Sequence, residues 1–278
     1  MTSYLNSNFD LNATELVDVF DELPFWAAPF GIKLLDRVNY HKKITALDIG
    51  FGAGFPLTEL AMRMGSSSKV YGIDPWKSAS DRTRKKLALY GIQNVELIDG
   101  VAESIPLEDK SVDLIISNNG LNNVSDLDKV LTECARISKP EAQLVFTFNA
   151  NTTFHEFYDL LAETLKEEQL TDALDKMNEQ IYTKRKPLSE FKEELINHGF
   201  SIASVDEEYF EYKFADGTSM LNHYFIRLAF IGGWKNIIPT DKQSTIFKIV
   251  EEKMNQQSSK DGFFRMSVPF YVISGKYH

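Results

Sequence analysis

The sequence contains a single cysteine, Cys134, in 278 residues. One thiol cannot form an internal disulfide, and it cannot build a zinc site from thiolates. Cys134 stands at helical spacing with the apolar residues Leu127, Leu131 and Ile137. We therefore expect this thiol to pack in a hydrophobic core rather than to react.

Positive charge and long apolar runs are also scarce. Lys and Arg number 30 against 40 Asp and Glu, which gives a net charge of −10. Nucleic-acid phosphates require a basic partner surface, so we expect no nucleic-acid binding. No apolar stretch approaches the roughly 18 residues of a membrane span, and the N-terminus lacks a basic segment followed by an apolar one. We expect a cytoplasmic protein that does not bind membranes, and the oligomeric state stays open.

What the sequence does contain is a glycine-rich turn between two apolar segments. The run Ile44–Ile49 reads as a buried strand, and it leads into Gly50, Gly52 and Gly54. A helix-forming run, Leu57–Met64, follows directly. Glycines at such a turn allow a ligand to lie on the backbone, because no side chain blocks its approach.

An acidic residue follows at the position expected of a ribose-binding group. Asp74 comes twenty positions after Gly54 and ends a second apolar run, Val70–Ile73. A carboxylate at the tip of the second strand binds ribose hydroxyls in nucleotide-binding α/β domains. The two patterns together predict a cofactor that contains a nucleoside.

The glycine spacing and the neighbouring charge disfavour a dinucleotide. The dinucleotide fingerprint needs a third glycine where this sequence has Phe55 or Leu57, depending on the register. Asp48 places negative charge beside the turn, where a pyrophosphate would need donors. A cofactor that carries an ammonium group fits better, so an NAD-dependent oxidoreductase is the less favoured alternative.

Four stretches in order resemble the class I S-adenosylmethionine-dependent methyltransferases of the small-molecule type, with a methyltransferase-11-like domain. They are Leu47–Gly54, Gly72–Asp74, Val101–Pro106, and Ser111–Ser117 followed by Leu121–Val124. The resemblance covers roughly residues 40 to 150. It implies S-adenosyl-L-methionine as the cofactor and S-adenosyl-L-homocysteine as its product.

The resemblance also implies roles for individual residues. Gly50, Gly52 and Gly54 would face the amino acid and ribose parts of the cofactor, and Asp48 would hold its amino group. Asp74 would accept hydrogen bonds from both ribose hydroxyls.

The adenine and methionine ends have their own expected contacts. Ala102 and Glu103 would lie beside the adenine, with Pro75 or Trp76 on its other face. Val101 stands where the family usually has an acidic or amide residue that reaches the adenine amino group, so Asp99, Glu103 or the backbone would make this contact here. Ser117 and Asn118 would meet the methionine part.

The order of elements predicts an α/β fold with a doubly wound, Rossmann-like sheet of seven strands that is mostly parallel. We expect an N-terminal helical lid over 1–40, with Trp26 and Phe30 as anchors, and a cofactor-binding core over 41–150. Residues 151–278 would complete the sheet with an antiparallel C-terminal strand and carry a helical cap at about 216–260. The core strands are expected at 44–49, 69–73, 94–98, 112–117 and 143–148, with helices near 56–64, 79–90 and 125–138.

The remaining segments are read from periodicity and turn residues. One helical stripe runs from Thr152 to Leu174, and an aromatic-rich helix is expected from Ser219 to Trp234. The long strands 200–214 and 263–277 are expected to pair. Pro269 lacks an amide donor, so we expect a bulge or an exposed edge there.

Methyl transfer is an in-line displacement, so the protein mainly has to position the acceptor and exclude water. A base is needed only for some acceptors. His223, His155 and Asn122 are the candidate catalytic residues, and Asn119 and Asn123 could also orient a polar substrate. The sequence shows no carboxylate cluster suited to magnesium, so we expect no metal.

The function predicted from sequence is transfer of a methyl group to a small, partly apolar metabolite. A non-catalytic module that binds S-adenosylmethionine or S-adenosylhomocysteine is the alternative. The sequence does not distinguish oxygen, nitrogen and carbon as the acceptor atom.

Overall fold

The structure is a computed structural model of the chain, and it describes all residues except 1–2, 7–8, 11–12 and 20–23. The chain divides into two compact units. We call residues 10–149, 187–208 and 270–278 the sheet unit, and residues 1–9, 150–186 and 209–269 the helical unit. Residues 216–260, the expected helical cap, lie entirely in the helical unit, together with 150–186.

Seven strands form one sheet in the order β3-β2-β1-β4-β5-β7-β6. The pairs β1–β2, β2–β3, β1–β4 and β4–β5 are parallel, and β7 is antiparallel to β5. This confirms the predicted fold class. The strands are β1 (Thr45–Ile49), β2 (Lys69–Asp74), β3 (Val95–Asp99), β4 (Val112–Asn118), β5 (Ser138–Asn149), β6 (Phe200–Phe214) and β7 (Phe264–Tyr277).

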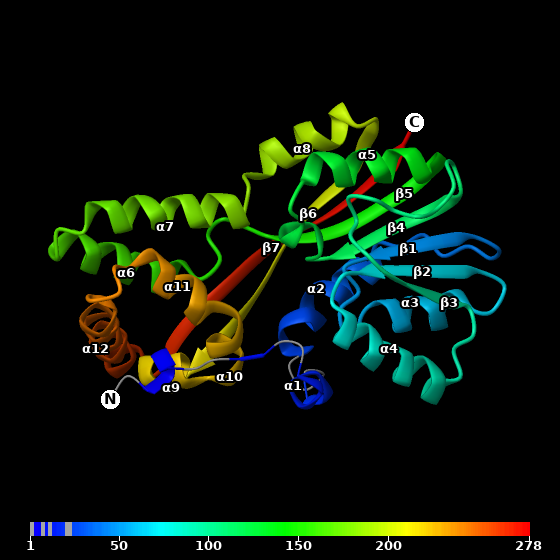
Figure 1. Cartoon of the computed structure of the whole chain (residues 1–278). Coiled ribbons are helices and arrows are strands. Elements are labelled where there is room, and N and C mark those ends of the chain that lie inside the picture. The colour runs from blue at the N-terminus through cyan, green and yellow to red at the C-terminus, as the bar shows by residue number, and fades with distance from the viewer. Residues whose placement is uncertain (1–2, 7–8, 11–12, 20–23) are drawn as a thin grey trace. The chain divides into compact units, whose positions relative to one another are not determined.

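The central strands are apolar because both of their faces are covered. Leu47 of β1 pairs with Tyr71 of β2 on one side and with Ile115 of β4 on the other. In Figure 1, helices α3 (Leu57–Met64) and α4 (Lys77–Tyr90) lie on one face of the sheet, and α5 (Leu127–Ile137) and α8 (Leu188–Asn197) lie on the other.

Helix α5 shows how the sequence selects its buried face. Val130, Leu131, Cys134 and Ile137 are buried along one side, and the Asp126 side chain caps the N-terminus by accepting from the Lys129 amide. Burial raises the pKa of the Cys134 thiol to about 12. Cys134 is thus an unreactive core residue, as predicted from its spacing.

The N-terminal segment of the sheet unit contains α1 (Thr14–Val19) and α2 (Pro24–Asp36). Residues 1–2, 7–8, 11–12 and 20–23 of the expected lid lie outside the described residues. Phe30 of α2 is fully buried, and its ring centroid lies 4.4 Å from that of Phe270 in β7. The Trp26 ring is tilted by 58° against the Phe30 ring, with 5.2 Å between their centroids, and Trp26 stays partly exposed.

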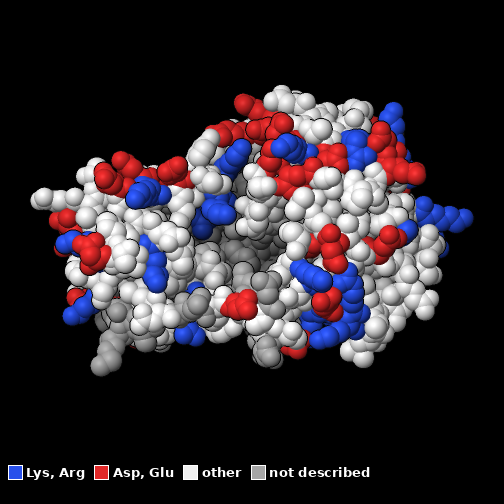
Figure 2. All heavy atoms as spheres, in the orientation of Figure 1, with Lys and Arg blue, Asp and Glu red and all other residues white. Residues whose placement is uncertain are grey.

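Charge is distributed unevenly over the helices of the sheet unit. Figure 2 shows basic side chains gathered over α4 and acidic side chains over α5 and α8. The basic residues of α4 are tied locally, since Arg84 pairs with Asp81 and Asp99. Lys85 lies 3.5 Å from Asp18 of α1. The cluster is therefore a solvated helix face.

The helical unit differs from the sequence prediction at two places. The stripe 152–174 forms two helices, α6 (His155–Glu167) and α7 (Thr171–Lys184), with a left-handed residue, Gln169, between them. The helix expected over 219–234 is interrupted at His223. It consists of α9 (Gly217–Asn222), α10 (Tyr224–Ile226), a π-helical turn over Arg227–Ile231 and α11 (Gly232–Ile237).

The core of the helical unit is aromatic. Trp234 of α11 is buried, stacks on Phe157 with 3.9 Å between centroids, and donates from Nε1 to the Tyr158 hydroxyl at 3.0 Å. Helix α12 (Gln243–Asp261) packs on α6 and α9. Within the described ranges, no helix combines the length and apolar character needed to cross a bilayer.

The long strand β7 is paired with β5 over only part of its length. The pairing of β5 with β7 runs from Gln143–Lys276 to Asn149–Phe270. The Pro269 ring therefore lies just beyond this ladder, where its missing amide breaks no β5 hydrogen bond. The Pro269 carbonyl accepts from the Ala150 amide instead.

Candidate functional site

A cavity of about 550 Å³ opens in the sheet unit at the carboxyl ends of β1, β2 and β4. The order of strands reverses between β1 and β4, and such a switch point is where open α/β sheets bind ligands. The lining includes many of the residues predicted to bind the cofactor: Gly50, Gly52, Asp74, Pro75, Trp76, Val101, Ala102, Glu103 and Asn118. Trp26 and Ala27 of the expected lid also line it.

The three glycines of the turn meet three different requirements. A Cβ on Gly50 would lie 2.9 Å from the Gly120 backbone, so two chain segments pack directly on each other there. Gly52 has φ +51° and nothing within 4 Å of its would-be Cβ, so its position is open. Gly54 does not line the cavity, and a Cβ on it would lie 3.0 Å from the Thr83 hydroxyl of α4. Only Gly50 and Gly52 thus meet the cavity.

Two side chains of α4 hydrogen-bond to the backbone of the glycine turn. The buried hydroxyl of Thr83 donates to the Gly52 carbonyl at 3.1 Å, and Lys86 donates to the Ala53 carbonyl at 2.6 Å. The Gly50 amide continues the sheet by donating to the Ile73 carbonyl. These contacts hold the turn in one conformation before any ligand binds.

Asp74 stands at the tip of β2 with both carboxylate oxygens engaged. Oδ2 accepts from the Gly52 amide and Oδ1 from the Trp76 amide, each at 2.8 Å. Burial raises the pKa of Asp74 against the lowering effect of these two amides. Each carboxylate oxygen has a second lone pair, so Asp74 can still accept from two hydroxyls of a ligand.

Asp48 lies behind the turn and is completely buried. Neither of its carboxylate oxygens has a hydrogen-bond partner among the described residues. Burial, followed by the negative charge of Asp74, raises the pKa of Asp48 well above its ordinary value. Buried carboxylates without partners are rare in folded proteins. This one has the acceptors that an ammonium group needs, directly or through water.

Glu103, expected beside the adenine, is already engaged. Its Oε1 accepts from the amide and the hydroxyl of Ser125, at 2.8 and 2.7 Å, and from the Asp126 amide. Burial acts to raise the pKa of Glu103, and these hydrogen bonds outweigh it and lower the pKa. Glu103 thus joins the loop after β3 to the turn before α5, and both segments line the cavity.

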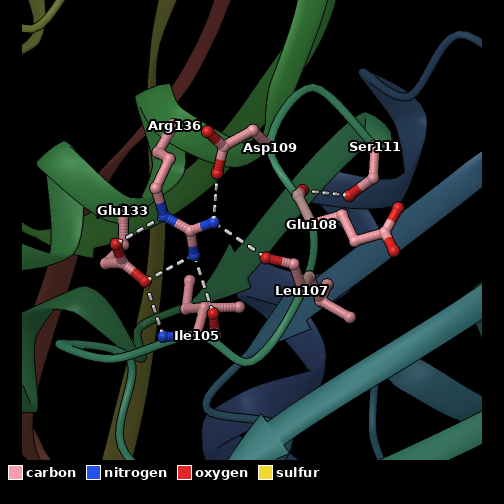
Figure 3. A network of polar contacts seen from close by, with 7 residues as sticks. All are labelled: Ile105, Leu107, Glu108, Asp109, Ser111, Glu133 and Arg136. Carbon is pink, nitrogen blue, oxygen red and sulfur yellow. Dashed lines mark hydrogen bonds and ion pairs between the residues drawn. The ribbon is translucent and has the colours of Figure 1, made fainter.

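The loop after β3 is held a second time, by a network that sequence reasoning missed. Figure 3 shows the Arg136 guanidinium of α5 donating to the Ile105 and Leu107 carbonyls, at 2.7 and 2.8 Å, while it pairs with Asp109 and Glu133. Glu133 in turn accepts from the Ile105 amide at 2.7 Å. Helix α5 therefore fixes the segment that follows Val101–Glu103. The only local signal was a Glu and an Arg three positions apart.

The amide-rich run after β4 divides into supporting and lining residues. Ser117 is buried and donates to the Ile49 carbonyl, so it supports the turn rather than lining the cavity. Asn118 lines the cavity and donates to the Ala27 carbonyl of α2 at 3.1 Å. Asn122 donates to Asn119 at 3.2 Å and does not line the cavity.

Among the described residues, Asn119 has the one buried side-chain donor in this run that lacks a hydrogen-bond partner. Its Nδ2 is buried without a partner, its φ is +58°, and it lines the cavity, as Asn123 does. Gly120, which the sequence did not single out, packs so closely that a Cβ would lie 2.3 Å from the Ile49 carbonyl oxygen. The pairing of Gly120 with Gly50 brings the two loops together.

The two candidate histidines belong to the helical unit, and neither lines this cavity. The His155 ring is half exposed, with Nδ1 3.6 Å from Glu156. His223 separates α9 from α10 and packs edge-on against Phe214. Burial lowers the pKa of His223, which favours the neutral ring.

The charges around the cavity favour a cationic ligand. Among the described residues, no Lys, Arg or His lines it, whereas Asp74 and Glu103 do and Asp48 lies behind the turn. A pyrophosphate would meet carboxylates without a cation to offset them. The site fits the ribose and ammonium groups of S-adenosylmethionine. Asp74 beside the open glycine turn suits the ribose hydroxyls, and the unpartnered, buried Asp48 suits the ammonium group.

The described residues also contain one group with the spacing of metal ligands. Asp128 of α5 lies beside Glu194 and His198 at the end of α8. None of the three lines the cavity. His198 Nε2 lies 3.2 Å from Asp128, and its Nδ1 lies 2.7 Å from the Glu194 carbonyl. These contacts join α5 to α8.

Comparison with known proteins gives a consistent result. Residues 47–146 match the family model described as a methyltransferase domain. The demethylmenaquinone methyltransferase of Anoxybacillus flavithermus is 32% identical over 126 residues, which are 45% of this chain and 53% of that protein. That of Geobacillus stearothermophilus is 33% identical over 127 residues. The chain spans about half the length of these curated relatives.

Solved structures share the fold. A protein of Bacillus subtilis, YcgJ, has a TM-score of 0.57 at 18% identity and covers 90% of this chain and 98% of its own. An S-adenosylmethionine-dependent methyltransferase of Aquifex aeolicus has a TM-score of 0.53 at 23% identity and covers 71% and 92%. Residues 47–146, which match the methyltransferase-domain model, supply all of the cavity lining described above except Trp26 and Ala27.

Proposed function

We propose that this protein transfers a methyl group from S-adenosylmethionine to a small, partly apolar metabolite. The observation that carries the proposal is an open Gly52 in the cavity lining with the buried, unpartnered Asp48 behind it. Among the described residues, no basic side chain lines this cavity. When bound, S-adenosylmethionine supplies a methyl group on a positively charged sulfur. Attack by the acceptor breaks the sulfur–carbon bond, and the electron pair stays on sulfur.

The residues of the cavity bind and orient rather than react. Asp48 accepts from the cofactor ammonium, and Asp74 accepts from the two ribose hydroxyls while its backbone contacts keep it in place. Trp76, Pro75 and Ala102 border the adenine. Asn118 and Asn119 face the methionine end, where the free amide of Asn119 can hold a carboxylate or a polar acceptor group.

The acceptor is expected to have an apolar part. Trp26, Phe51 and Phe55 line the cavity, and relatives over the matched segment are named demethylmenaquinone methyltransferases. A hydroxyl or protonated amine acceptor needs a base. His223, His155 and Asn122 stay candidates, of which His223 has the pKa shift that suits a neutral base.

Binding and turnover test the proposal separately. Calorimetry should detect heat when S-adenosylhomocysteine binds to the protein, and NAD should give no heat of binding. Incubation with methyl-labelled S-adenosylmethionine and a metabolite extract should yield one labelled product. Binding without any labelled product would favour the non-catalytic module, and NAD binding without S-adenosylhomocysteine binding would refute the proposal.

A further inference from the structure

Gly31 lies inside α2, where a glycine stabilises a helix less than an alanine does. Its φ lies outside the left-handed region, so the backbone conformation does not require glycine at this position. The available space does require it. A Cβ on Gly31 would overlap the Phe55 ring, since it would lie only 2.7 Å from the ring's Cζ and closer still to its Cε1. The Phe55 ring therefore packs directly on the backbone of α2.

The Phe55 ring is the movable side of this contact. Phe55 directly follows the last glycine of the turn, lines the cavity and is only partly buried. The ring atoms that meet Gly31 are at the far end of the side chain, so rotation about the side-chain bonds can displace them. Because α2 borders the ring on one side and the cavity borders it on another, a Cβ at position 31 would push the ring toward the cavity.

The neighbouring part of the cavity wall is fixed by hydrogen bonds. Asn118 at the end of β4 donates from Nδ2 to the Ala27 carbonyl of α2 at 3.1 Å, and its Oδ1 accepts from the Thr147 hydroxyl at 3.0 Å. A Cβ on Gly31 would lie 3.2 Å from Asn118 Nδ2, a contact that a shift of a few tenths of an ångström relieves. A methyl group added at Gly31 would thus act mainly on Phe55.

This contact lies on the side of the cavity opposite Asp74. In the sheet, β1 lies between β2 and β4, and Asp74 ends β2 whereas Asn118 ends β4. Trp26, Ala27, Phe55 and Asn118 all line the cavity, and we call these four residues the β4 end. A ribose bound at Asp74 would leave the β4 end for the group that receives the methyl.

We propose that Gly31 is a positioning residue of this site: it lets the Phe55 ring pack on α2 and so keeps the β4 end open for the methyl acceptor. The packing of the ring is independent of the reaction, whereas the use of this space by an acceptor rests on the proposed methyltransferase function. Transfer is in line with the sulfur–methyl bond, so a larger group on the sulfur would extend into the space that the acceptor needs. The space can therefore be measured before the acceptor is identified.

The first experiment tests the contact without any ligand. Thermal unfolding is compared for wild type, Gly31→Ala, Phe55→Ala and the double variant. In the Phe55→Ala background, G31A should raise the thermal midpoint by a few degrees, because alanine favours the helix and no ring opposes it. In the wild-type background the gain should be smaller or reversed, and the difference measures the coupling between the two residues. Equal changes in both backgrounds would refute the contact.

The second experiment measures the space at the β4 end by calorimetry. The probes are S-adenosylhomocysteine, which has no group to transfer, and an analogue of S-adenosylmethionine with benzyl in place of methyl. G31A should bind S-adenosylhomocysteine as wild type does but the benzyl analogue about 5- to 150-fold more weakly. The double variant should bind the analogue as Phe55→Ala does. The control is Gly232→Ala, a helical position outside the cavity with nothing within 4 Å of its would-be Cβ, and it should change neither affinity.

Three results would overturn the proposal. Wild type could bind S-adenosylhomocysteine and reject the benzyl analogue, G31A could bind the analogue as well as wild type does, or the loss in G31A could persist when the Phe55 ring is removed. Failure of wild type to bind S-adenosylhomocysteine would refute the proposed methyltransferase function instead, while the unfolding experiment would still decide whether Gly31 positions Phe55.

Discussion

Replacing Gly52 by alanine separates ligand binding from folding in the glycine turn. Gly52 has φ +51° and no atom within 4 Å of its would-be Cβ. The free protein therefore has room for the methyl group and pays only the backbone strain of a left-handed alanine. That strain is about 1–2 kcal/mol, equivalent to a fall of the thermal midpoint by a few degrees, at about 2–4 °C per kcal/mol for a protein of this size.

Ligand binding should suffer in addition. The new methyl group occupies the open side of the turn, where the ligand would lie on the backbone. Overpacking of a tight contact costs about 1–3 kcal/mol, which is about a 5- to 150-fold rise in Kd. The Gly52 amide also donates to Asp74, so any shift of the turn disturbs the carboxylate that is proposed to bind ribose.

Two further glycine variants serve as controls. Gly91, at the end of α4, has φ +67° and an equally open position, but it does not line the cavity. G91A should lose similar stability and bind S-adenosylhomocysteine as wild type does. Gly50→Ala should destabilise the fold itself, because its Cβ would meet the Gly120 backbone at 2.9 Å.

The measurements are thermal unfolding and calorimetry with S-adenosylhomocysteine. The expected pattern is a similar loss of stability in G52A and G91A with weakened binding in G52A alone. Wild-type affinity in G52A would mean that the ligand does not lie on this turn, and the placement of the cofactor would then be wrong.

Three other predictions concern charge. The pKa of Asp48 is raised in the free protein, so the folded state holds a proton that the unfolded chain releases, and stability falls as pH rises between the ordinary and the raised pKa. A bound ammonium group lowers the pKa of Asp48 again, so S-adenosylhomocysteine binding should release a proton. Calorimetry in buffers of different ionisation enthalpy should detect this proton release, and Asp48→Asn should abolish it. Arg136→Met should lower stability by about 1–3 kcal/mol and weaken S-adenosylhomocysteine binding several-fold. The control Arg63→Met, which breaks an exposed pair within one helix, should change stability and binding only a little. Equal effects of the two variants would refute the role of the network around Arg136. If His223 is the base, His223→Gln should lower kcat about 10²- to 10⁴-fold and leave the affinity for S-adenosylhomocysteine unchanged. The wild-type rate should fall as the pH drops through the lowered pKa of His223. An unchanged kcat in the variant would exclude His223 as the base.

The core strands were predictable because residues next to each strand set where it ends. The run that ends in Asp74 stops at the end of β2, and the glycines after Ile49 end β1. The start of β5 was placed at residue 143, whereas the strand begins at Ser138. The sequence Pro140–Ala142 suggests a turn, and the strand instead passes through it with Glu141 at φ +67°.

The helical unit was less predictable because packing between distant segments decides its breaks. Apolar periodicity continues through residues 168–170, and nothing local requires the left-handed Gln169 that ends the helix there. The π-helical turn at Arg227–Ile231 likewise accompanies the burial of Trp234 against Phe157 and Tyr158. Helix propensities carry no information about that partner.

The residues of the candidate site also fall into those set by local sequence and those set by contacts between distant segments. Gly52 and Asp74 were found from sequence because a turn and a strand tip impose their residue types at short range. Arg136 and Gly120 act on segments some thirty to seventy positions away, so no local pattern marks them. Both hold in place the loops that the recognisable motifs occupy. The residues that the motifs identify here, Gly52 and Asp74, line the cavity, and the residues that fix their geometry become visible only in the fold. A search for variants that alter cofactor affinity without touching the cofactor should therefore begin at α5 and at the contact between Gly50 and Gly120.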